Sequence, residues 1–512
     1  MDISNLIEEM TTPIHDFLVK NSESHTIRCY MPGHKGTEDP LDITEIDGAD
    51  SLYDTDTNGR KGIIAQSEKN ASKLFGSKRT LYSCSGSTLA IQTMLTLAKL
   101  RGNGKDHVIA GRYSHRSFIN SCILLGLIPS WVYPEEYLSA AVTPESIEAK
   151  INSRTLAVFI NSIDYYGGMS NISAIAEVCH SHGIPLLVDN AHGAYLKFAP
   201  VDLHPMTLGA DMCADSAHKT LPVLTGGAYL HIANEKYCAM AKEAMALTAT
   251  SSPSYLILDS LDRCNRTIAE KPFHIAEICN KVTALKRHCA DIGYVLSQSD
   301  YMKVTFDCAA VHSTGFAMAE MLKEFGIECE YADEYRCVLL FGSGSTDVDF
   351  ETIKTVLMAN TPRSVFVRSL PSPPVHIRPQ TACSPAKAYF SGKVRLPVMM
   401  TVGKVCAGAV APCPPGIPLI MPGEVVTIDA PRELRDKGIA DIQKALGIYL
   451  MQNNIESKER KQTNQEIASQ LQFIVFLSGN INIIKQLHGI LQRHLSNVML
   501  LLRSYPEHNI QE

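Results

Sequence analysis

The sequence has no apolar run of the roughly 18 or more residues that a membrane span requires. Its opening, MDISNLIEEMTTPIHDFLVK, has neither the basic start nor the apolar stretch of an export signal. An excess of positive charge is also missing, because 47 Lys and Arg stand against 53 Asp and Glu, a formal charge of −6. These absences argue against a membrane or secreted protein and against the usual basic nucleic-acid binder. We therefore expect a cytoplasmic enzyme.

The 15 cysteines form no CxxC pair and no Cys/His cluster with the spacing of a zinc site. They are spread singly from Cys29 to Cys413. In a chain of this size without an export signal, such cysteines are better interpreted as small buried apolar side chains than as a disulfide framework. Reactive or metal-binding thiols are the less favoured alternative, and we expect no metal site.

Length and composition indicate a folded protein of two or three domains. The 512 residues are 45% apolar and 20% charged, ordinary values that exclude wholesale disorder. We see no internal repeat, and a proline-rich passage from Pro362 to Pro379 indicates a boundary. We expect five parts, which are an N-terminal segment (1–60), a large domain (61–265), a small α+β domain (266–362), a C-terminal domain (380–447) and an atypical helical tail (448–512).

Between about residues 70 and 235, apolar β-type runs alternate with helix-like segments. Thr143-Pro144-Glu145 has the residues of a helix start, and Gly183 follows an apolar-periodic stretch, as a C-terminal cap does. This alternation predicts βαβ units and a parallel sheet covered on both faces. The predicted strands are HVIAG (107–111), TLAVFI (155–160), IPLLVD (184–189) and GAYLHI (227–232).

A lysine stands between a short predicted strand and a Gly-Gly turn in ADSAHKTLPVLTGGAYLH (214–231). Taken alone, Lys219 is more often a solvated surface charge than a catalytic group. Upstream, an apolar strand ends at Asp189, and open parallel sheets place their ligands at that end of a strand. A carboxylate there either caps a helix or keeps a pyridine nitrogen protonated, which makes the ring an electron sink.

Two other predicted strand-to-helix loops carry polar side chains. The SGST segment 85–88 opens into an apolar-periodic helix, so its backbone N–H groups and hydroxyls either cap that helix or bind a phosphate. His115, in GRYSHRSF (111–118), is either an ordinary histidine or one that lies against an aromatic cofactor. The order of phosphate-type loop, histidine, strand-end aspartate and lysine resembles pyridoxal-phosphate enzymes of the aspartate-aminotransferase fold.

More closely, the sequence resembles the ornithine/lysine/arginine decarboxylase family, in its shorter bacterial form without an N-terminal receiver-like domain. The resemblance covers roughly residues 10–445 and implies an α/β fold, with a mostly parallel sheet in the large domain and smaller α+β C-terminal domains. SAHKTL and its partner DNAHGAY are its most specific motifs. The matching stretches are MPGHKG (31–36), SGST (85–88), SHRS (114–117), DYYGGMSNI (164–172), DNAHGAY (189–195), SAHKTL (216–221), SSPSYLILDSLDR (251–263) and PPGIPLIMPGE (414–424).

The resemblance implies a role for each residue of these motifs. Lys219 would form a Schiff base with pyridoxal 5'-phosphate, and Asp189 would pair with the ring nitrogen. His192 would support the ring and the imine, and His115 would stack on the ring face. The implied phosphate-binding residues are Ser85, Gly86, Ser87, Thr88, Ser216 and His218. The implied catalytic residues are Lys219, His218 and His192, with the proton returned to Cα by His218 or Lys219.

The implied reaction is the decarboxylation of arginine, lysine or ornithine to agmatine, cadaverine or putrescine and CO2, in polyamine biosynthesis. The family pattern also implies a homodimer or higher homo-oligomer, in which the 251–255 loop reaches the partner's cofactor. Nucleic acid and membrane are not expected as partners. Two alternatives stay open, which are another enzyme of this fold (an aminotransferase or a carbon–sulfur lyase) and a catalytically impaired regulatory relative.

The sequence departs from the family pattern at several positions. Ser85 stands where the family usually has Asn, and Asn190 replaces the usual acid after the strand-end aspartate. Ala407 and Gly408 lie where the family often has an acid, and the tail from 448 matches nothing in the family.

Three acidic residues are ambiguous from sequence. Glu424 either meets the cationic end of a substrate or is a structural turn residue. Asp54 and Asp56 are further loop candidates for a substrate or a metal, although no third metal ligand is visible.

Overall fold

A computed structural model describes residues 10–23, 62–135, 139, 141–296, 300–362, 378–396, 400–411, 416–427 and 448–451. Contacts divide the chain into two units, residues 1–450 and 451–512. Several sequence-based predictions fall outside the described residues. These are the MPGHKG motif, Asp54, Asp56, Cys29, Cys413 and the predicted helical tail beyond residue 451.

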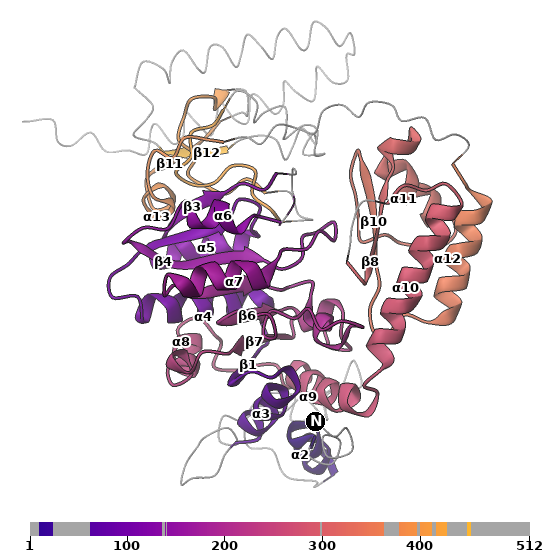
Figure 1. Ribbon diagram of the computed structural model, residues 1–512. Coiled ribbons are helices and arrows are strands. Elements are labelled where there is room, and N and C mark those ends of the chain that lie inside the picture. The colour runs from indigo at the N-terminus through magenta and orange to yellow at the C-terminus, as the bar shows by residue number, and fades with distance from the viewer. Residues whose placement is uncertain are drawn as a thin grey trace, which may run out of the picture. The chain divides into compact units, whose positions relative to one another are not determined.

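A seven-stranded sheet forms the centre of the large domain (Figure 1). The strand order is β1-β7-β6-β5-β4-β2-β3, and the pairs from β6 to β3 are parallel. The strands are β1 (Arg79–Ser83), β2 (His107–Gly111), β3 (Ile128–Val132), β4 (Thr155–Asn161), β5 (Leu186–Asp189), β6 (Met212–Asp215) and β7 (Ala228–Ile232). The four predicted strands are confirmed in position as β2, β4, β5 and β7.

The direction of β7 differs from the parallel arrangement that the alternating pattern predicted. β7 is antiparallel to both of its neighbours, β6 and β1. Only the short 3-10 helix η4 (Ala217–Lys219) and a turn connect β6 to β7. A parallel neighbour usually needs an α-helix that carries the chain across the sheet, and this connection contains none, so the chain turns back. The sheet is therefore mostly, not wholly, parallel.

Helices cover both faces of the sheet because successive residues of each strand point to opposite sides. On one face, Val108 and Ala110 pack with α4 (Gly86–Leu100), α5 (Arg116–Leu125) and α8 (Ala241–Ala246). On the other face, Ile109 and Val158 pack with α6 (Pro144–Glu148) and α7 (Ile172–Ser181). Two fully buried faces explain why the strands are continuous apolar runs.

The two predicted helix ends are confirmed. The Thr143 side chain accepts a hydrogen bond from the Ser146 N–H at the start of α6, with Pro144 in the first turn. Past the end of α7, Gly183 adopts φ 63°, and its N–H donates to the His180 carbonyl. The Ile184 N–H donates to the Cys179 carbonyl. These paired bonds form a Schellman motif, which favours glycine at the left-handed position.

A third core joins the remaining elements to one edge of the large domain. It contains α2 (Pro13–Glu23), α3 (Ile63–Phe75), α9 (Tyr255–Glu270) and α10 (His274–Asp291). A three-stranded sheet of order β8-β10-β9 packs with α10, α11 and α12. The bounds are β8 (Lys303–Asp307), β9 (Tyr331–Ala332), β10 (Arg336–Leu340), α11 (Gly315–Glu324) and α12 (Asp347–Ala359).

The last described elements are α13 (Pro385–Tyr389), β11 (Lys393–Leu396) and β12 (Ile448–Met451). Val394 and Leu396 of β11 pack against a small core that includes Cys406, Leu419 and Val426. All thirteen cysteines of the described residues are free, and nine of them are buried, as expected for small apolar side chains. Among the described residues, none of the helices combines the length and apolar character needed to cross a membrane.

Candidate active site

The carboxyl ends of the parallel strands bring together the polar residues that follow them. His115 comes after β2, Asn161 ends β4, Asp189 ends β5, and Lys219 follows β6. A pocket lies at this edge of the sheet, where open α/β sheets bind their ligands. Its lining residues are Ser87, Tyr113, His115, Asn161, Ile163, Asp164, Tyr165, Asp189, Ala191, His192, Lys219 and Ile417.

Lys219 is half-buried at the end of η4, and its Nζ lies 2.9 Å from His192 Nε2. Burial lowers the pKa of Lys219 below its ordinary value; the charge of Asp189 opposes this shift and that of Lys303 adds to it. Burial also holds the pKa of His192 well below its ordinary value. Burial therefore disfavours the charged form of both side chains.

The second ring nitrogen of His192 is also buried. Among the described residues, its Nδ1 is buried and makes no hydrogen bond. A buried polar atom without a partner costs free energy, on the order of 1–3 kcal/mol, unless a bound molecule satisfies it. The imidazole also packs edge-on against the Tyr165 ring, with centroids 5.2 Å apart, so its orientation is fixed.

Asp189 is 3% exposed at the end of β5. One carboxylate oxygen accepts the Ala191 N–H at 3.1 Å. Burial raises the pKa of Asp189 to about 6, with the Lys219 charge opposing the rise. A cationic group brought next to this carboxylate would restore its ionised form.

His115 caps α5, the helix that begins after its loop. Its Nδ1 accepts the Ser117 N–H at 3.2 Å. Burial lowers the pKa of His115 to about 4, so the ring is neutral at neutral pH. Gly416 packs against the ring so closely that a Cβ there would lie 2.6 Å from His115 Nε2. The C-terminal segment thus fixes the position of this imidazole.

The predicted phosphate loop joins β1 to α4, and Ser87 lines the pocket. Ser85 stands at the N-cap of α4 without a side-chain capping bond. The Gly86 amide, which was expected to face a phosphate, instead donates to the Gly226 carbonyl at 2.8 Å. The reason is that the turn containing Gly226 packs directly on the loop. A Cβ added at Gly226 would lie only 3.2 Å from the Cys84 carbonyl oxygen.

The structure brings five of the predicted site residues into the pocket lining and leaves the others outside it. Ser87, His115, Asp189, His192 and Lys219 line the pocket, whereas Ser85, Gly86, Thr88, Ser216 and His218 do not. The Ser216 carbonyl accepts the Lys219 N–H at 3.1 Å. The His218 Nδ1 lies 2.9 Å from the Gly227 carbonyl oxygen. Both residues therefore support the turn that carries Lys219.

Glu424 is a structural residue in this fold. It is 2% exposed, and one of its oxygens lies 3.2 Å from Arg112 Nη2 and 2.8 Å from the Met421 amide. Arg112 also donates to the carbonyls of Pro418 and Leu419. This buried pair favours the turn interpretation over contact with a substrate, and it anchors the segment that places Ile417 in the pocket.

Sequence reasoning missed several lining residues, although most of them stand inside motifs that it singled out. Tyr165 and Asp164 belong to DYYGGMSNI, Tyr113 to the loop of His115, and Ile417 to the C-terminal PPGIPLIMPGE motif. Asn161 could have been found as the residue that directly follows the 155–160 run. Asn190, which replaces the usual acid, is fully buried and donates to Asp215 on β6, so the local network still contains a carboxylate.

The fold and the cluster around Lys219 define an α/β enzyme of the aspartate-aminotransferase-like class. Residues 12–305 match the family model described as Orn/Lys/Arg decarboxylase, major domain. Residues 365–435 match the one described as Orn/Lys/Arg decarboxylase, C-terminal domain. The chain belongs to the Orn/Lys/Arg decarboxylase family. The predicted family, fold class and kind of enzyme are thereby confirmed.

Relatives with similar sequences carry decarboxylase names. The chain is 27% identical over 460 residues to an arginine decarboxylase of Bacillus subtilis, covering 81% of this chain and 91% of the relative. It is 23% identical over 504 residues to lysine decarboxylase LdcA of Pseudomonas aeruginosa, covering 73% and 66% of the two chains. The fold is similar to that of the Francisella novicida lysine decarboxylase LdcF, with a TM-score of 0.70, 17% identity and coverage of 86% and 81%.

Proposed function

We propose that this protein uses pyridoxal 5'-phosphate, held by Lys219, to remove the α-carboxyl group of a basic L-amino acid as CO2 and release the amine. One observation carries the proposal. A half-buried lysine amine lies 2.9 Å from His192 in a pocket that also contains a buried carboxylate, Asp189. Membership of the Orn/Lys/Arg decarboxylase family supports the same reaction.

The residues of the pocket fit this coenzyme. Asp189 is a buried carboxylate whose pKa is raised to about 6 by burial. A cation next to it, such as a protonated pyridine nitrogen, would stabilise its ionised form. His192 Nδ1 is a buried polar atom without a partner among the described residues. The first turn of α4, with Ser87 in the pocket lining, provides N–H groups and a hydroxyl for a phosphate. When bound, the coenzyme would supply an electron-accepting ring that stabilises the negative charge left by CO2.

Lys219 and His192 would exchange a proton. Burial lowers the pKa of Lys219, and a neutral amine is the form that attacks an aldehyde carbon. His192 Nε2 is at hydrogen-bond distance from Nζ, so it can accept the proton that the amine loses and return it. Because burial keeps the pKa of His192 low, the imidazole would not retain that proton. His218, whose Nδ1 lies at the Gly227 carbonyl, is less well placed for this step.

The pocket walls would exclude water from the reacting carboxylate. Ile163 and Ile417 contribute apolar side chains, and Tyr113 and Tyr165 contribute aromatic rings. A carboxylate that enters such a site exchanges water for a less polar surrounding, and this favours its departure as neutral CO2. Ile417 comes from the C-terminal segment, which an aminotransferase or a carbon–sulfur lyase would not require. This contribution favours a decarboxylase.

Glu330 is a candidate to receive the distal cation of the substrate. It is half-buried, and its carboxylate accepts a hydrogen bond of 2.7 Å from the hydroxyl of Tyr165, which lines the pocket. The charge of Glu330 also raises the pKa of Lys219, opposing the larger effect of burial. A guanidinium or ammonium group next to this carboxylate would form a charge-assisted hydrogen bond.

The test is to incubate the purified protein with pyridoxal 5'-phosphate and, separately, arginine, lysine and ornithine, and to measure CO2 and amine. We expect one of the three to yield both in equal amounts, and Lys219→Ala to abolish the reaction. Lys323→Ala is the matched control, because that side chain is 60% exposed and pairs with Glu328, which does not line the pocket. A protein that binds the coenzyme but releases a 2-oxo acid, or no amine from any of the three, would contradict the proposal. We also propose a homodimer, as the family pattern implies.

A further inference from the structure

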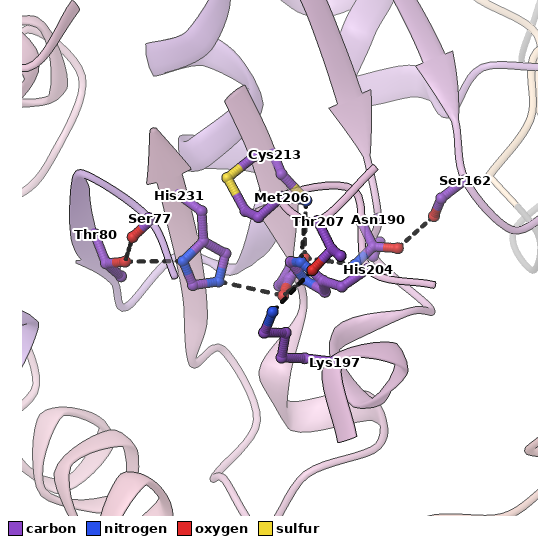
Figure 2. Close-up of polar contacts among 12 residues, drawn as sticks. Ser77, Thr80, Ser162, Asn190, Lys197, His204, Met206, Thr207, Cys213 and His231 are labelled. Carbon is purple, nitrogen blue, oxygen red and sulfur yellow. Dashed lines mark hydrogen bonds and ion pairs between the residues drawn. The ribbon is translucent and has the colours of Figure 1, made fainter. Parts of the chain in front are cut away.

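A network of polar side chains, drawn in Figure 2, includes Asn190, His204, Cys213 and His231, none of which has exposed surface. At its centre is Asp215, the last residue of β6, with no exposed surface. Its two oxygens receive the amide of Asn190 at 2.7 Å, the Nε2 of His204 at 2.9 Å and the thiol of Cys213 at 3.2 Å. The Nε2 of His231 lies 3.3 Å away in a close polar contact.

Asp215 carries a negative charge that this network compensates. Burial by itself raises the pKa of a carboxyl group, but the interactions with His204 and His231 lower the pKa of Asp215 below its ordinary value. The group is therefore an anion at neutral pH, in a place where an uncompensated charge would be strongly unfavourable. Its hydrogen bonds are charge-assisted and correspondingly strong.

His204, Asp215 and His231 also have the composition of a metal site, since one ligand atom of each lies within 4.8 Å of the others. The hydrogen bonds argue against that interpretation. The Met206 N–H donates to His204 Nδ1, so this nitrogen has a lone pair and the proton of the neutral ring is on Nε2. That proton points to Asp215 and occupies the place of a metal ion. On the other side of Asp215, His231 Nδ1 lies 2.8 Å from the Thr80 hydroxyl, which continues the network to Ser77.

Asn190 connects the anion to the pocket. It has no exposed surface, and its side-chain oxygen accepts a short hydrogen bond from Ser162. Its carbonyl accepts the Gly193 N–H at 2.8 Å, which closes the turn containing Ala191 and His192. A Cβ at Gly193 would lie 2.0 Å from the Asn190 side-chain oxygen, so the turn packs directly on this amide. The orientation of Asn190 therefore determines the path of the backbone between Asp189 and His192.

We propose that Asp215 is a positioning residue, which holds the Asn190 amide and thereby fixes the turn that presents Asp189 and His192 to the pocket. The amide can donate to Asp215 with its nitrogen and accept from Ser162 with its oxygen in only one orientation. The buried anion selects this orientation. The effect on the coenzyme site rests on the function proposed above, whereas the effect on the turn does not.

The first test uses the protein without coenzyme and measures hydrogen exchange of peptides that cover residues 186–200. Asp215→Asn replaces the anion by an amide, and we expect the Asn190 and Gly193 N–H groups to exchange at least about tenfold faster, the equivalent of one charge-assisted hydrogen bond. Asp262→Asn is the matched control. Asp262 is also fully buried, but its carboxylate accepts the N–H groups of Ile14 and His15 and the Ser67 hydroxyl. That control should leave the 186–200 peptides unchanged.

The second test measures the dissociation constant of pyridoxal 5'-phosphate by absorbance. We expect Asp215→Asn to weaken binding about tenfold and Asp262→Asn to leave it unchanged. The double variant Asn190→Asp/Asp215→Asn exchanges the carboxylate and the amide between the two positions. Because the pair still contains one of each, this variant should recover most of the affinity that Asp215→Asn loses. Unchanged exchange in Asp215→Asn, or equal losses in both single variants, would overturn the positioning role. If the unmodified protein binds no coenzyme while exchange behaves as expected, the proposed function fails and the positioning role stands.

Discussion

Asp189 is a buried carboxylate, and the charge of Lys219 opposes the effect of burial on its pKa. The strand places it there, since β5 is buried on both faces and ends at this residue. Burial raises the pKa of Asp189 to about 6 from an ordinary value near 4. At neutral pH the protein without coenzyme must therefore ionise a buried group, and this costs stability.

The pH dependence of unfolding tests this cost. Below about pH 4 the group is protonated in both folded and unfolded protein, so it has no effect on pH dependence there. Between about pH 4 and pH 6 the folded state binds the proton more tightly, so stability falls as pH rises through the folded pKa. Asp189→Asn should remove this loss, which is on the order of 3 kcal/mol at pH 7. Urea unfolding of the coenzyme-free protein at pH 4.5 and pH 7.5 measures it.

The same variant should bind pyridoxal 5'-phosphate at least about tenfold more weakly, because an amide does not stabilise a protonated ring nitrogen. Greater stability at pH 7 together with weaker binding would mark Asp189 as a residue kept for function at the expense of stability. An Asp189→Asn protein that is less stable at pH 7 than the unmodified protein would contradict this interpretation.

At the scale of single residues, part of the candidate site could be predicted from the sequence because its motifs stand at strand ends. Asp189 ends one apolar strand and Lys219 follows another, and the carboxyl ends of parallel strands meet at one edge, so their proximity was predictable. The direction of each side chain was not. The Gly86 amide donates to Gly226, and His218 lies at Gly227, because the β6–β7 connection folds back on the predicted phosphate loop.

The segment 416–424 is an element without regular secondary structure, and a buried ion pair holds it to the large domain. Arg112 follows β2 and is fully enclosed with Glu424, the side chains being 3% and 2% exposed. Burial opposes the charge of each partner, but the Glu424 charge raises the pKa of Arg112 above its ordinary value, so the cation persists. Removing one partner leaves the other charge buried and unpaired.

We expect Glu424→Ala to destabilise the protein by about 3–5 kcal/mol, as for other broken buried pairs. The double variant Arg112→Leu/Glu424→Leu should cost less than the sum of Arg112→Leu and Glu424→Leu, because it leaves no lone charge. Urea unfolding of the unmodified protein, the two single leucine variants and the double variant gives the coupling energy, and the same measurement gives the loss in Glu424→Ala. Additive losses would show that the two charges do not depend on each other.

At the scale of elements, the long apolar runs were easy to predict and the edge strands were not. β2, β4 and β5 are buried on both faces, so their sequences are continuous apolar runs. β3 is an edge strand with mostly half-buried residues and contains Pro129, so its sequence has little strand character. The sequence of β7 predicts a buried strand correctly. Its direction depends on the connection before it, and the pattern of apolar residues carries no information about that direction.

The whole pocket is assembled from distant parts of the chain. The large domain provides the strand ends, residues 416 and 417 close one side, and the region of β9 brings Glu330 to Tyr165. Lys303 of β8 joins these parts from inside. Its buried ammonium donates to the Asp300 carboxylate at 2.9 Å and to the Asp164 carbonyl at 3.2 Å. No local pattern in the sequence could predict such contacts.

Glu330→Gln tests whether this assembly selects the substrate. This variant removes a carboxylate from the distal end of the pocket, so the KM for the preferred basic amino acid should rise about tenfold. The kcat should change much less, because the lost contact binds the substrate and the transition state equally. Glu328→Gln is the matched control, since this neighbouring glutamate is 75% exposed. Equal KM values for the two variants would remove Glu330 from substrate recognition.

The contact of Gly416 with His115 has a consequence for how the protein is made. During synthesis, Lys219 and the strand ends leave the ribosome long before residues 416 and 417, so the emerging chain can complete its large domain while the pocket is still open on one side. The enclosure of the pocket is finished only when residues 416 and 417 have been made. A prematurely terminated product would therefore carry a reactive lysine without the wall that isolates it.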